Sequence, residues 1–224
     1  LLPGPPSELE PMFTNFGINA LLKRLTSTEI IQSRVLRFFG IGEAQLEHDL
    51  IDLIDQQTNP TIAPLAGNGE VTIRLTAKSS SLELGEELIN ETEKEILNRV
   101  GQYFYGYGDT TLIKEMGRWL EKSNLTLAAA ESLTGGLFQE EVTSISGVSK
   151  WFKGGVVTYS ADVKEKVLGV KKETIDQYGV VSEQCAREMA ENVRELVGAD
   201  IGVSFTGVAG PASLEGKEPG TVYI

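Results

Sequence analysis

The feature that most constrains the fold is an alternation of short apolar strands with helices through the second half of the chain. A buried strand is expected over 125–130, and the glycine pair at 135–136 lets the backbone turn sharply into a helix. The series continues with strands over 154–159, 201–205 and 220–224 and helices over 111–122, 136–143, 162–168 and 182–197. Such alternation predicts a layered α/β domain with a largely buried sheet.

A smaller domain precedes this series. Strand-like runs at 34–39, 61–65, 70–76 and 103–105 alternate with helical patterns at 43–55 and 82–100. A hairpin is expected around Gly67-Asn68-Gly69, because such residues allow the backbone angles of a tight turn. The order β-α-β-β-α-β predicts a small α+β domain of the split βαβ type. With a linker at 106–109, the two domains are expected at 33–108 and 109–224.

The first residues follow neither pattern. Four prolines among the first eleven residues predict a rigid loop, because proline removes a backbone donor and clashes inside a helix. Leu1 and Leu2 are typical of the end of a strand. Residues 1–32 are therefore expected to be the tail of a truncated domain and a linker.

Charge and composition narrow the partners. The 20 basic and 32 acidic residues give a net charge of −12, which opposes binding to nucleic acid. A single cysteine, Cys185, and a single histidine, His48, argue against a disulfide and a zinc site. No apolar run approaches the roughly 18 to 20 residues that cross a bilayer. We expect a cytoplasmic homo-oligomer without metal or cofactor, bound to neither membrane nor nucleic acid.

The first candidate site segment is Ala128-Ala129-Ala130-Glu131-Ser132-Leu133-Thr134-Gly135-Gly136. Ser132 falls at a strand-to-helix turn, where a nucleophile is commonly exposed. The start of the following helix offers unpaired N–H groups and a positive dipole end, which suit an anion or an oxyanion. The same residues also fit a simple helix cap followed by packing glycines.

Two further segments place polar groups at strand ends. In the first, Tyr159 ends a strand and Lys164 lies in the first turn of the next helix, where burial and the helix dipole would lower its pKa and favour a base. Lys164 fits equally a surface position complemented by Asp162 and Glu165. In the second, the loop 206–211 offers backbone donors to a phosphate, although a plain turn explains it as well.

Together, these segments and Gly179-Val180-Val181-Ser182 resemble the carboxy-terminal domain of the CinA family (competence/damage-inducible protein A). Residues 33–108 resemble the small KH-like central domain of that family, and the opening residues resemble the end of its molybdopterin-binding-like domain. The resemblance implies a nicotinamide mononucleotide deamidase, which hydrolyses the carboxamide to nicotinate mononucleotide and ammonia in pyridine nucleotide salvage.

The expected roles follow from the resemblance and from the chemistry of an amide. Ser132 is expected to attack the carboxamide carbon, Lys164 to accept the proton of Ser132, and Tyr159 to orient these two side chains. The three residues would do the work of a catalytic triad without a histidine. Leu133 stands where most relatives carry a cysteine, so Ser132 remains the candidate nucleophile. The expected substrate-binding residues are Glu131, Thr134, Gly135, Gly136, Thr206, Gly207 and Gly210.

Two other functions remain open at this point. One is nucleotide-pyrophosphate (ADP-ribose) hydrolysis, which would belong to the amino-terminal domain of the parent protein. The other is a competence-related binding protein, suggested by the family name and the KH-like domain. The acidic net charge and the lack of a Gly-x-x-Gly clamp with basic neighbours argue against nucleic-acid binding.

Overall fold

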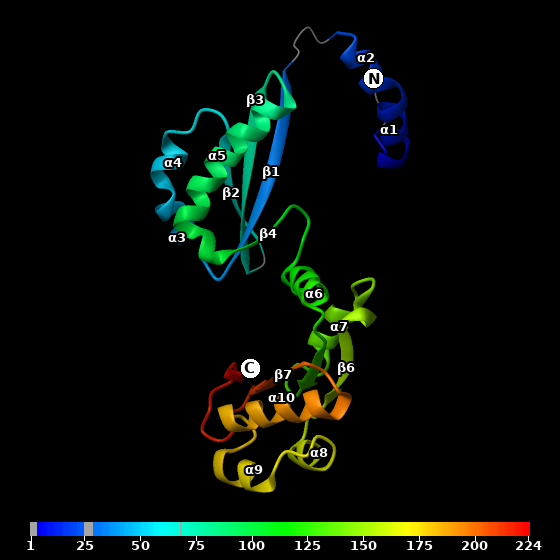
Figure 1. Ribbon diagram of the computed structural model, residues 1–224, viewed down its shortest axis with the longest axis vertical. Helices are drawn as coiled ribbons and strands as arrows, with labels where there is room; N and C mark the ends of the chain where they lie inside the picture. The colour runs from blue at the N-terminus through cyan, green and yellow to red at the C-terminus, as the bar shows by residue number, and fades with distance from the viewer. Residues whose placement is uncertain (1–3, 25–28, 68) are drawn as a thin grey trace. The chain divides into compact units, whose positions relative to one another are not determined.

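The computed structural model describes residues 4–24, 29–67 and 69–224. The chain divides into two compact units, Leu1–Asp109 and Thr110–Ile224 (Figure 1). The first unit holds a small α+β domain, and the second holds a layered α/β domain, so the predicted fold class is confirmed.

The small domain has a four-stranded sheet of order β2-β3-β1-β4 in which all neighbouring strands are antiparallel. Its strands are β1 (Ile30–Phe39), β2 (Thr61–Ala66), β3 (Glu70–Ser79) and β4 (Phe104–Tyr107), and its helices are α3 (Glu43–Asp49), α4 (Ile51–Asp55), α5 (Leu82–Val100) and the short 3-10 turn η2 (Gly101–Tyr103). The helix α5 packs across β3 and β1 (Figure 1). One apolar core joins the sheet to α3 and α5, which is the predicted split βαβ arrangement.

Three boundaries differ from the sequence prediction. The helix expected over 43–55 is divided into α3 and α4, because Leu50 leaves the helical backbone region at φ −114° and ψ 7°. The last strand begins at Phe104 and continues to Tyr107, where its backbone pairs with β1. The connection between β4 and α6 (Leu112–Ser123) therefore covers 108–111 and begins two residues later than the predicted linker at 106–109.

The segment before the small domain is helical, so the prediction of a rigid loop is wrong. Helix α1 (Pro6–Met12) continues through a π-helical turn (Phe13–Gly17) into α2 (Ile18–Leu22). Pro6 stands at the start of α1, where its missing N–H would have had no helical partner. Leu1, Leu2 and the hairpin residue Asn68, which carried earlier expectations, lie outside the described residues.

The second unit has a sheet of order β6-β5-β7-β8. Its strands β5 (Leu127–Glu131), β6 (Phe152–Val157) and β7 (Ile201–Gly207) are parallel, and β8 (Val222–Tyr223) is antiparallel to β7. The helices are α6 (Leu112–Ser123), α7 (Leu137–Thr143), α8 (Ala161–Lys166), α9 (Lys172–Tyr178) and α10 (Glu183–Val197), with a 3-10 turn at Val148–Lys150. Parallel strands connected by helices are the arrangement predicted from the alternating pattern.

Helices cover both faces of this sheet. Ala128 and Ala130 face a core built with α10, whereas Leu127 faces a second core built with α6 and α7. The alternation follows from the strand period of two residues. The helix α9 was not predicted from the sequence, and Trp119 on α6 is 56% exposed. Ile113, Met116 and Leu120 form the apolar inner face of α6.

Small residues allow the layers to approach closely. A Cβ on Gly155 would lie 1.9 Å from the carbonyl oxygen of Ala129 on the neighbouring strand, and a Cβ on Gly202 would lie 2.0 Å from that of Ala190 on α10. The atoms that such a Cβ would meet are backbone carbonyl oxygens, which cannot move aside as the end of a flexible side chain can. The close contacts of β5 with β6, and of β7 with α10, therefore require glycine.

We expect Gly155→Ala to lower the free energy of unfolding by about 1–3 kcal/mol, the usual cost of overpacking a tight core. Gly42→Ala is the matched control, because a Cβ there would meet no atom within 4 Å and φ is −78°. Thermal or urea unfolding of the two variants measures the difference. Equal stability of the two variants would contradict this account of the sheet.

Candidate active site

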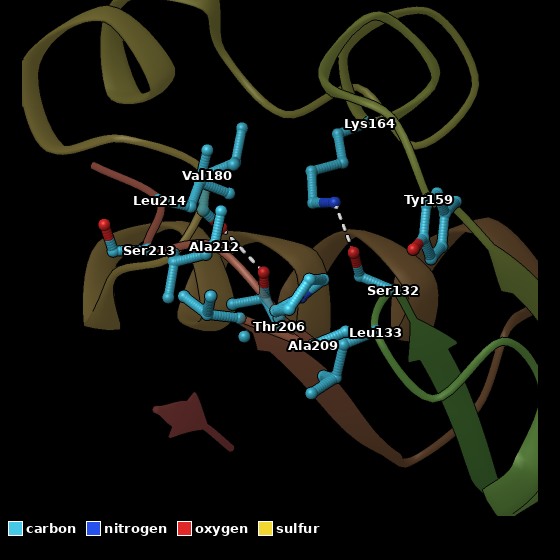
Figure 2. A pocket seen from close by; sticks show the side chains of 15 residues that line it. Ser132, Leu133, Tyr159, Lys164, Val180, Thr206, Ala209, Ala212, Ser213 and Leu214 are labelled. Atoms are coloured by element: carbon cyan, nitrogen blue, oxygen red, sulfur yellow. Dashed lines mark hydrogen bonds between the residues drawn. The ribbon is translucent and has the colours of Figure 1, made fainter. Parts of the chain in front are cut away.

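A pocket of about 320 Å³ lies where the parallel strands of the second unit end (Figure 2). Ser132 directly follows β5, Tyr159 follows β6, and Thr206 lies near the end of β7. The carboxyl ends of parallel strands meet at one edge of a sheet, so these distant segments converge. The lining consists of Ser132, Leu133, Tyr159, Lys164 and the segments 180–181 and 206–214.

A buried hydrogen bond between Lys164 and Ser132 is the central contact of this pocket. Lys164 Nζ donates a hydrogen bond of 2.7 Å to Ser132 Oγ (Figure 2). It donates a second bond, also 2.7 Å, to the carbonyl oxygen of Thr158. Lys164 is 1% exposed and Ser132 is 6% exposed. Among the described residues no carboxylate forms an ion pair with Lys164, and a lysine buried to this degree without one is unusual, so the pair is a candidate catalytic site.

The short helix α8 places the lysine in this position. The N–H of Lys164 bonds the carbonyl of Ser160 in the first turn, and the helix ends two residues later, so the side chain turns under the end of β6. Burial lowers the pKa of the Lys164 amine, and the nearby Cys185 and Glu215 oppose this shift in part. A lower pKa favours the neutral amine, which is the form that accepts a proton. The surface alternative for Lys164 is therefore wrong.

Cys185 lies in the core beside Lys164 rather than in the pocket. Burial raises the pKa of the Cys185 thiol to about 11, so the thiol is neutral near pH 7. Its N–H bonds the Ser182 hydroxyl, which caps α10 as expected for a serine at that position.

Glu131 was expected to bind substrate, but in the structure its side chain holds the backbone at the start of α7. Its carboxylate is fully buried and accepts bonds from the backbone N–H groups of Gly136, Phe138 and Gln139 at 2.9–3.1 Å. Burial by itself would raise the pKa of Glu131, but the nearby Thr134 hydroxyl and the backbone N–H groups of Gln139 and Phe138 outweigh burial and hold the pKa below its usual range. Glu131 therefore anchors the start of α7 and does not line the pocket.

This anchoring corrects the expectation that the N–H groups at the start of α7 bind substrate. Gly136 donates to Glu131, and Gly135 donates to the carbonyl of Ser132, so neither donor is free. Thr134, Gly135 and Gly136 are also absent from the described lining of the pocket. Free donors lie earlier in the turn: across the described residues, no hydrogen bond involves the backbone N–H of Leu133 or of Thr134.

Tyr159 stands at the mouth of the pocket, with 67% of its surface exposed. Figure 2 shows its ring beside Ser132. In the described structure no hydrogen bond joins its hydroxyl to Ser132 or Lys164. Tyr159 is thus brought to the site but is not fixed to the pair.

The glycine-bearing loop after β7 forms another wall. Thr206, Gly207 and Gly210 all line the pocket. Their expected contact with substrate stays a prediction. The Thr206 hydroxyl donates to the carbonyl of Val180 at 2.6 Å. A Cβ on Gly207 would lie 2.5 Å from the carbonyl oxygen of Thr221, so no other residue fits between β7 and its neighbour.

Sequence reasoning missed part of the lining. Val180, Val181 and Leu214 complete the wall opposite Ser132, and Glu215 joins the two segments by hydrogen bonds to both valine N–H groups. The Gly179 motif was noticed only as part of the resemblance.

Two absences complete the description of the residues at 4–24, 29–67 and 69–224. None of their helices is both long and apolar enough to span a bilayer. No three of their histidine, cysteine, aspartate or glutamate side chains are grouped so as to hold a metal ion.

Comparison with known proteins agrees with this architecture. Residues 109–224 match the family model of the CinA C-terminal domain, and residues 33–106 match that of the damage-inducible protein CinA KH domain. The competence-damage inducible proteins of Bacillus subtilis (strain 168) and Geobacillus sp. (strain WCH70) are 61% and 59% identical over 224 residues, which is all of this chain and 54% of each relative. A solved structure, the competence damage-inducible protein A of Klebsiella pneumoniae, is 38% identical with a TM-score of 0.49, covering 50% of this chain and 70% of that one.

The fold and the site define a protein that joins a split βαβ domain to an α/β domain with a serine–lysine pocket at its strand ends. Both domain types match models from a single family. The chain belongs to the CinA family of competence/damage-inducible proteins. It spans about half the length of the curated relatives that it matches.

The buried carboxylate of Glu131 generates a prediction on stability. We expect Glu131→Gln to lower the free energy of unfolding at pH 7 by about 2 kcal/mol, because an amide cannot accept all three backbone bonds and leaves buried donors unpaired. A depressed carboxylate pKa contributes stability that is present above the ordinary value of 4.5 and is lost as pH falls through the folded-state value. The difference between wild type and variant should therefore shrink below about pH 4.

Glu140→Gln is the control for this comparison, because Glu140 is an exposed acidic residue in the first turn of the same helix. Urea unfolding at pH 7 and at pH 3 measures both variants. A Glu131→Gln variant as stable as Glu140→Gln at pH 7 would contradict the anchoring role.

Proposed function

We propose that the second unit hydrolyses the carboxamide of nicotinamide mononucleotide to nicotinate mononucleotide and ammonia. The observation that carries this proposal is the buried hydrogen bond between Lys164 and Ser132 in the pocket. A serine hydroxyl is a weak nucleophile unless a base takes its proton, and a neutral lysine is such a base. The resemblance to the CinA deamidases supplies the substrate class.

The reaction proceeds in two halves. In the first half, Ser132 Oγ attacks the carboxamide carbon while its proton passes to the Lys164 amine. The tetrahedral intermediate collapses as the lysine returns that proton to the departing nitrogen, which leaves as ammonia. In the second half, water attacks the resulting ester, Lys164 takes the proton of the water and returns it to Ser132, and the carboxylate product leaves.

The turn after β5 supports the developing negative charge. The N–H groups of Leu133 and Thr134 follow the nucleophile directly and have no partner among the described residues. An N–H that follows a nucleophile at a strand-to-helix turn is well placed for an oxyanion. This assignment replaces the donors at Gly135 and Gly136, which are already used.

The remaining lining suits the rest of a mononucleotide. Gly207 and Gly210 supply bare backbone, which suits a phosphate. The Thr206 hydroxyl donates its proton to the carbonyl of Val180, so it can accept a hydrogen bond from a ribose hydroxyl. The volume of about 320 Å³ lies at the lower end of the roughly 300–1,000 Å³ typical of small-molecule sites. Tyr159, at the mouth, orients the pyridine ring against Ser132.

We expect Ser132→Ala and Lys164→Met each to lower kcat by at least about a thousandfold, because each removes a group used only in the transition state. Their effects should not add in the double variant, since the two side chains act as one unit. Ser160→Ala and Lys166→Met are the controls, because Ser160 and Lys166 flank the site in the same segment and are exposed. Release of ammonia from nicotinamide mononucleotide, with asparagine and glutamine as comparison substrates, measures the effect.

Two results would overturn the proposal. One is release of ammonia from the amino acids but not from the nucleotide. The other is a folded Ser132→Ala variant that keeps most of the wild-type turnover, which would make an activated water the nucleophile.

A further inference from the structure

The loop that closes one side of the pocket ends in an unusual turn. Leu214 and Lys217 exchange two backbone hydrogen bonds, of 3.0 and 2.9 Å, across the pair Glu215-Gly216. Both residues of the pair have positive φ, 53° for Glu215 and 73° for Gly216. Glycine adopts this backbone region readily and glutamate rarely does, so the glutamate side chain must have a reason to be there.

The contacts of the Glu215 carboxylate provide this reason. One oxygen accepts the N–H of Val180 at 2.9 Å, and the other accepts the N–H of Val181 at 3.1 Å. The residue before them is Gly179, where a Cβ would lie 2.1 Å from the same carboxylate. The positive φ of Glu215 aims its carboxylate at the segment 179–181, and the lack of a side chain at Gly179 leaves room for that carboxylate.

These hydrogen bonds join two walls of the pocket. Val180 and Val181 belong to one lining segment, and Leu214 belongs to the other. Figure 2 shows Val180 and Leu214 close together on the side of the pocket away from Tyr159. The Thr206 hydroxyl bonds Val180 from β7, so Val180 is held from two directions.

The same carboxylate acts on Lys164 through its charge. The ionisable groups that act on Lys164 are Cys185 from α10 and Glu215 from the loop, and both oppose the effect of burial on its pKa. The Cys185 thiol is neutral near pH 7, because burial raises its pKa to about 11. Glu215 is thus the carboxylate among these groups.

We propose that Glu215 is a positioning residue for the reaction of this pocket: its carboxylate fastens the wall 208–214 to Val180 and Val181. The proposal rests on the proposed function for its effect on turnover, but not for its effect on the loops and the lysine. It assigns no contact between Glu215 and the substrate.

The first experiment needs no substrate. Hydrogen exchange of the Val180 and Val181 amides and NMR titration of Lys164 with ¹³C at Cε are compared in wild type, Glu215→Gln and Glu218→Gln. Glu218 is the control, because it lies exposed on the same loop and its carboxylate makes no hydrogen bond within the described structure. We expect Glu215→Gln to speed exchange of both amides and to move the Lys164 titration to lower pH, because removing a negative charge disfavours the ammonium form.

Glu215→Asp separates the two effects. It keeps the charge but shortens the side chain, so exchange should be fast while the Lys164 titration stays close to that of wild type. If Glu215→Gln leaves both measurements where Glu218→Gln leaves them, the proposal is overturned. If the amides exchange faster but the Lys164 titration does not move, the fastening of the two wall segments is supported and an effect of the Glu215 charge on Lys164 is contradicted.

The second experiment uses the ammonia assay. In Glu215→Gln the KM should rise about tenfold, the effect of losing a charge-assisted hydrogen bond that shapes the site. The rise of kcat/KM with pH should begin at lower pH, because a neutral Lys164 is reached earlier. An unchanged KM and an unchanged pH profile would contradict the positioning role, because Glu215 would then affect only the structure of the loops. Wild-type protein without activity would instead contradict the proposed function, and the exchange and titration results would still decide the role of Glu215.

Discussion

The second unit is organised around a lysine amine that has been taken out of water. Removing an ammonium group from water is costly unless its hydrogen bonds are replaced, and Lys164 replaces two of its three with Ser132 Oγ and the carbonyl oxygen of Thr158. Several features serve this arrangement. The strand β6 ends before Thr158, so that a carbonyl is free to accept, and the helix α8 is short enough to turn its lysine inward. Burying the amine lowers the stability of the fold, but it keeps a proton acceptor next to the Ser132 hydroxyl.

Two adjacent residues at the end of β5 have different roles: Glu131 stabilises the following turn, and Ser132 is the candidate nucleophile. Side chains alternate along a strand, so Glu131 and Ser132 leave it in different directions. Glu131 enters the interior and fastens α7 through three backbone N–H groups, and Ser132 enters the pocket. A carboxylate that fixes the turn from beneath keeps the hydroxyl and the N–H groups of Leu133 and Thr134 in one place. Preorganised donors of this kind contribute more to catalysis than mobile ones, because no reorganisation is needed during the reaction.

Much of this architecture could be predicted from local pattern. The alternation of apolar runs and helices determined both domain types, and the convergence of Ser132 and Lys164 follows from the meeting of parallel strand ends at one edge. The failures share a physical cause: they depend on partners that are distant in sequence. Glu131 resembled a ligand because its backbone partners become visible only when α7 folds back over it. Glu215 carried no signal, because its role depends on the N–H groups of a loop 34 and 35 residues away. The helix at Pro6–Met12 was missed because proline was weighed without its position in the first turn.

The account stands on the claim that burial beside Ser132 keeps Lys164 ready to accept a proton. The most direct measurement is the titration of wild-type protein labelled with ¹³C at lysine Cε, with the Lys164 signal assigned by its loss in Lys164→Met. The account predicts that the Lys164 signal titrates clearly below 10.5, the ordinary lysine pKa. A Lys164 signal that titrates at or above 10.5 would show a stably charged ammonium, which cannot act as the base, and would contradict the account.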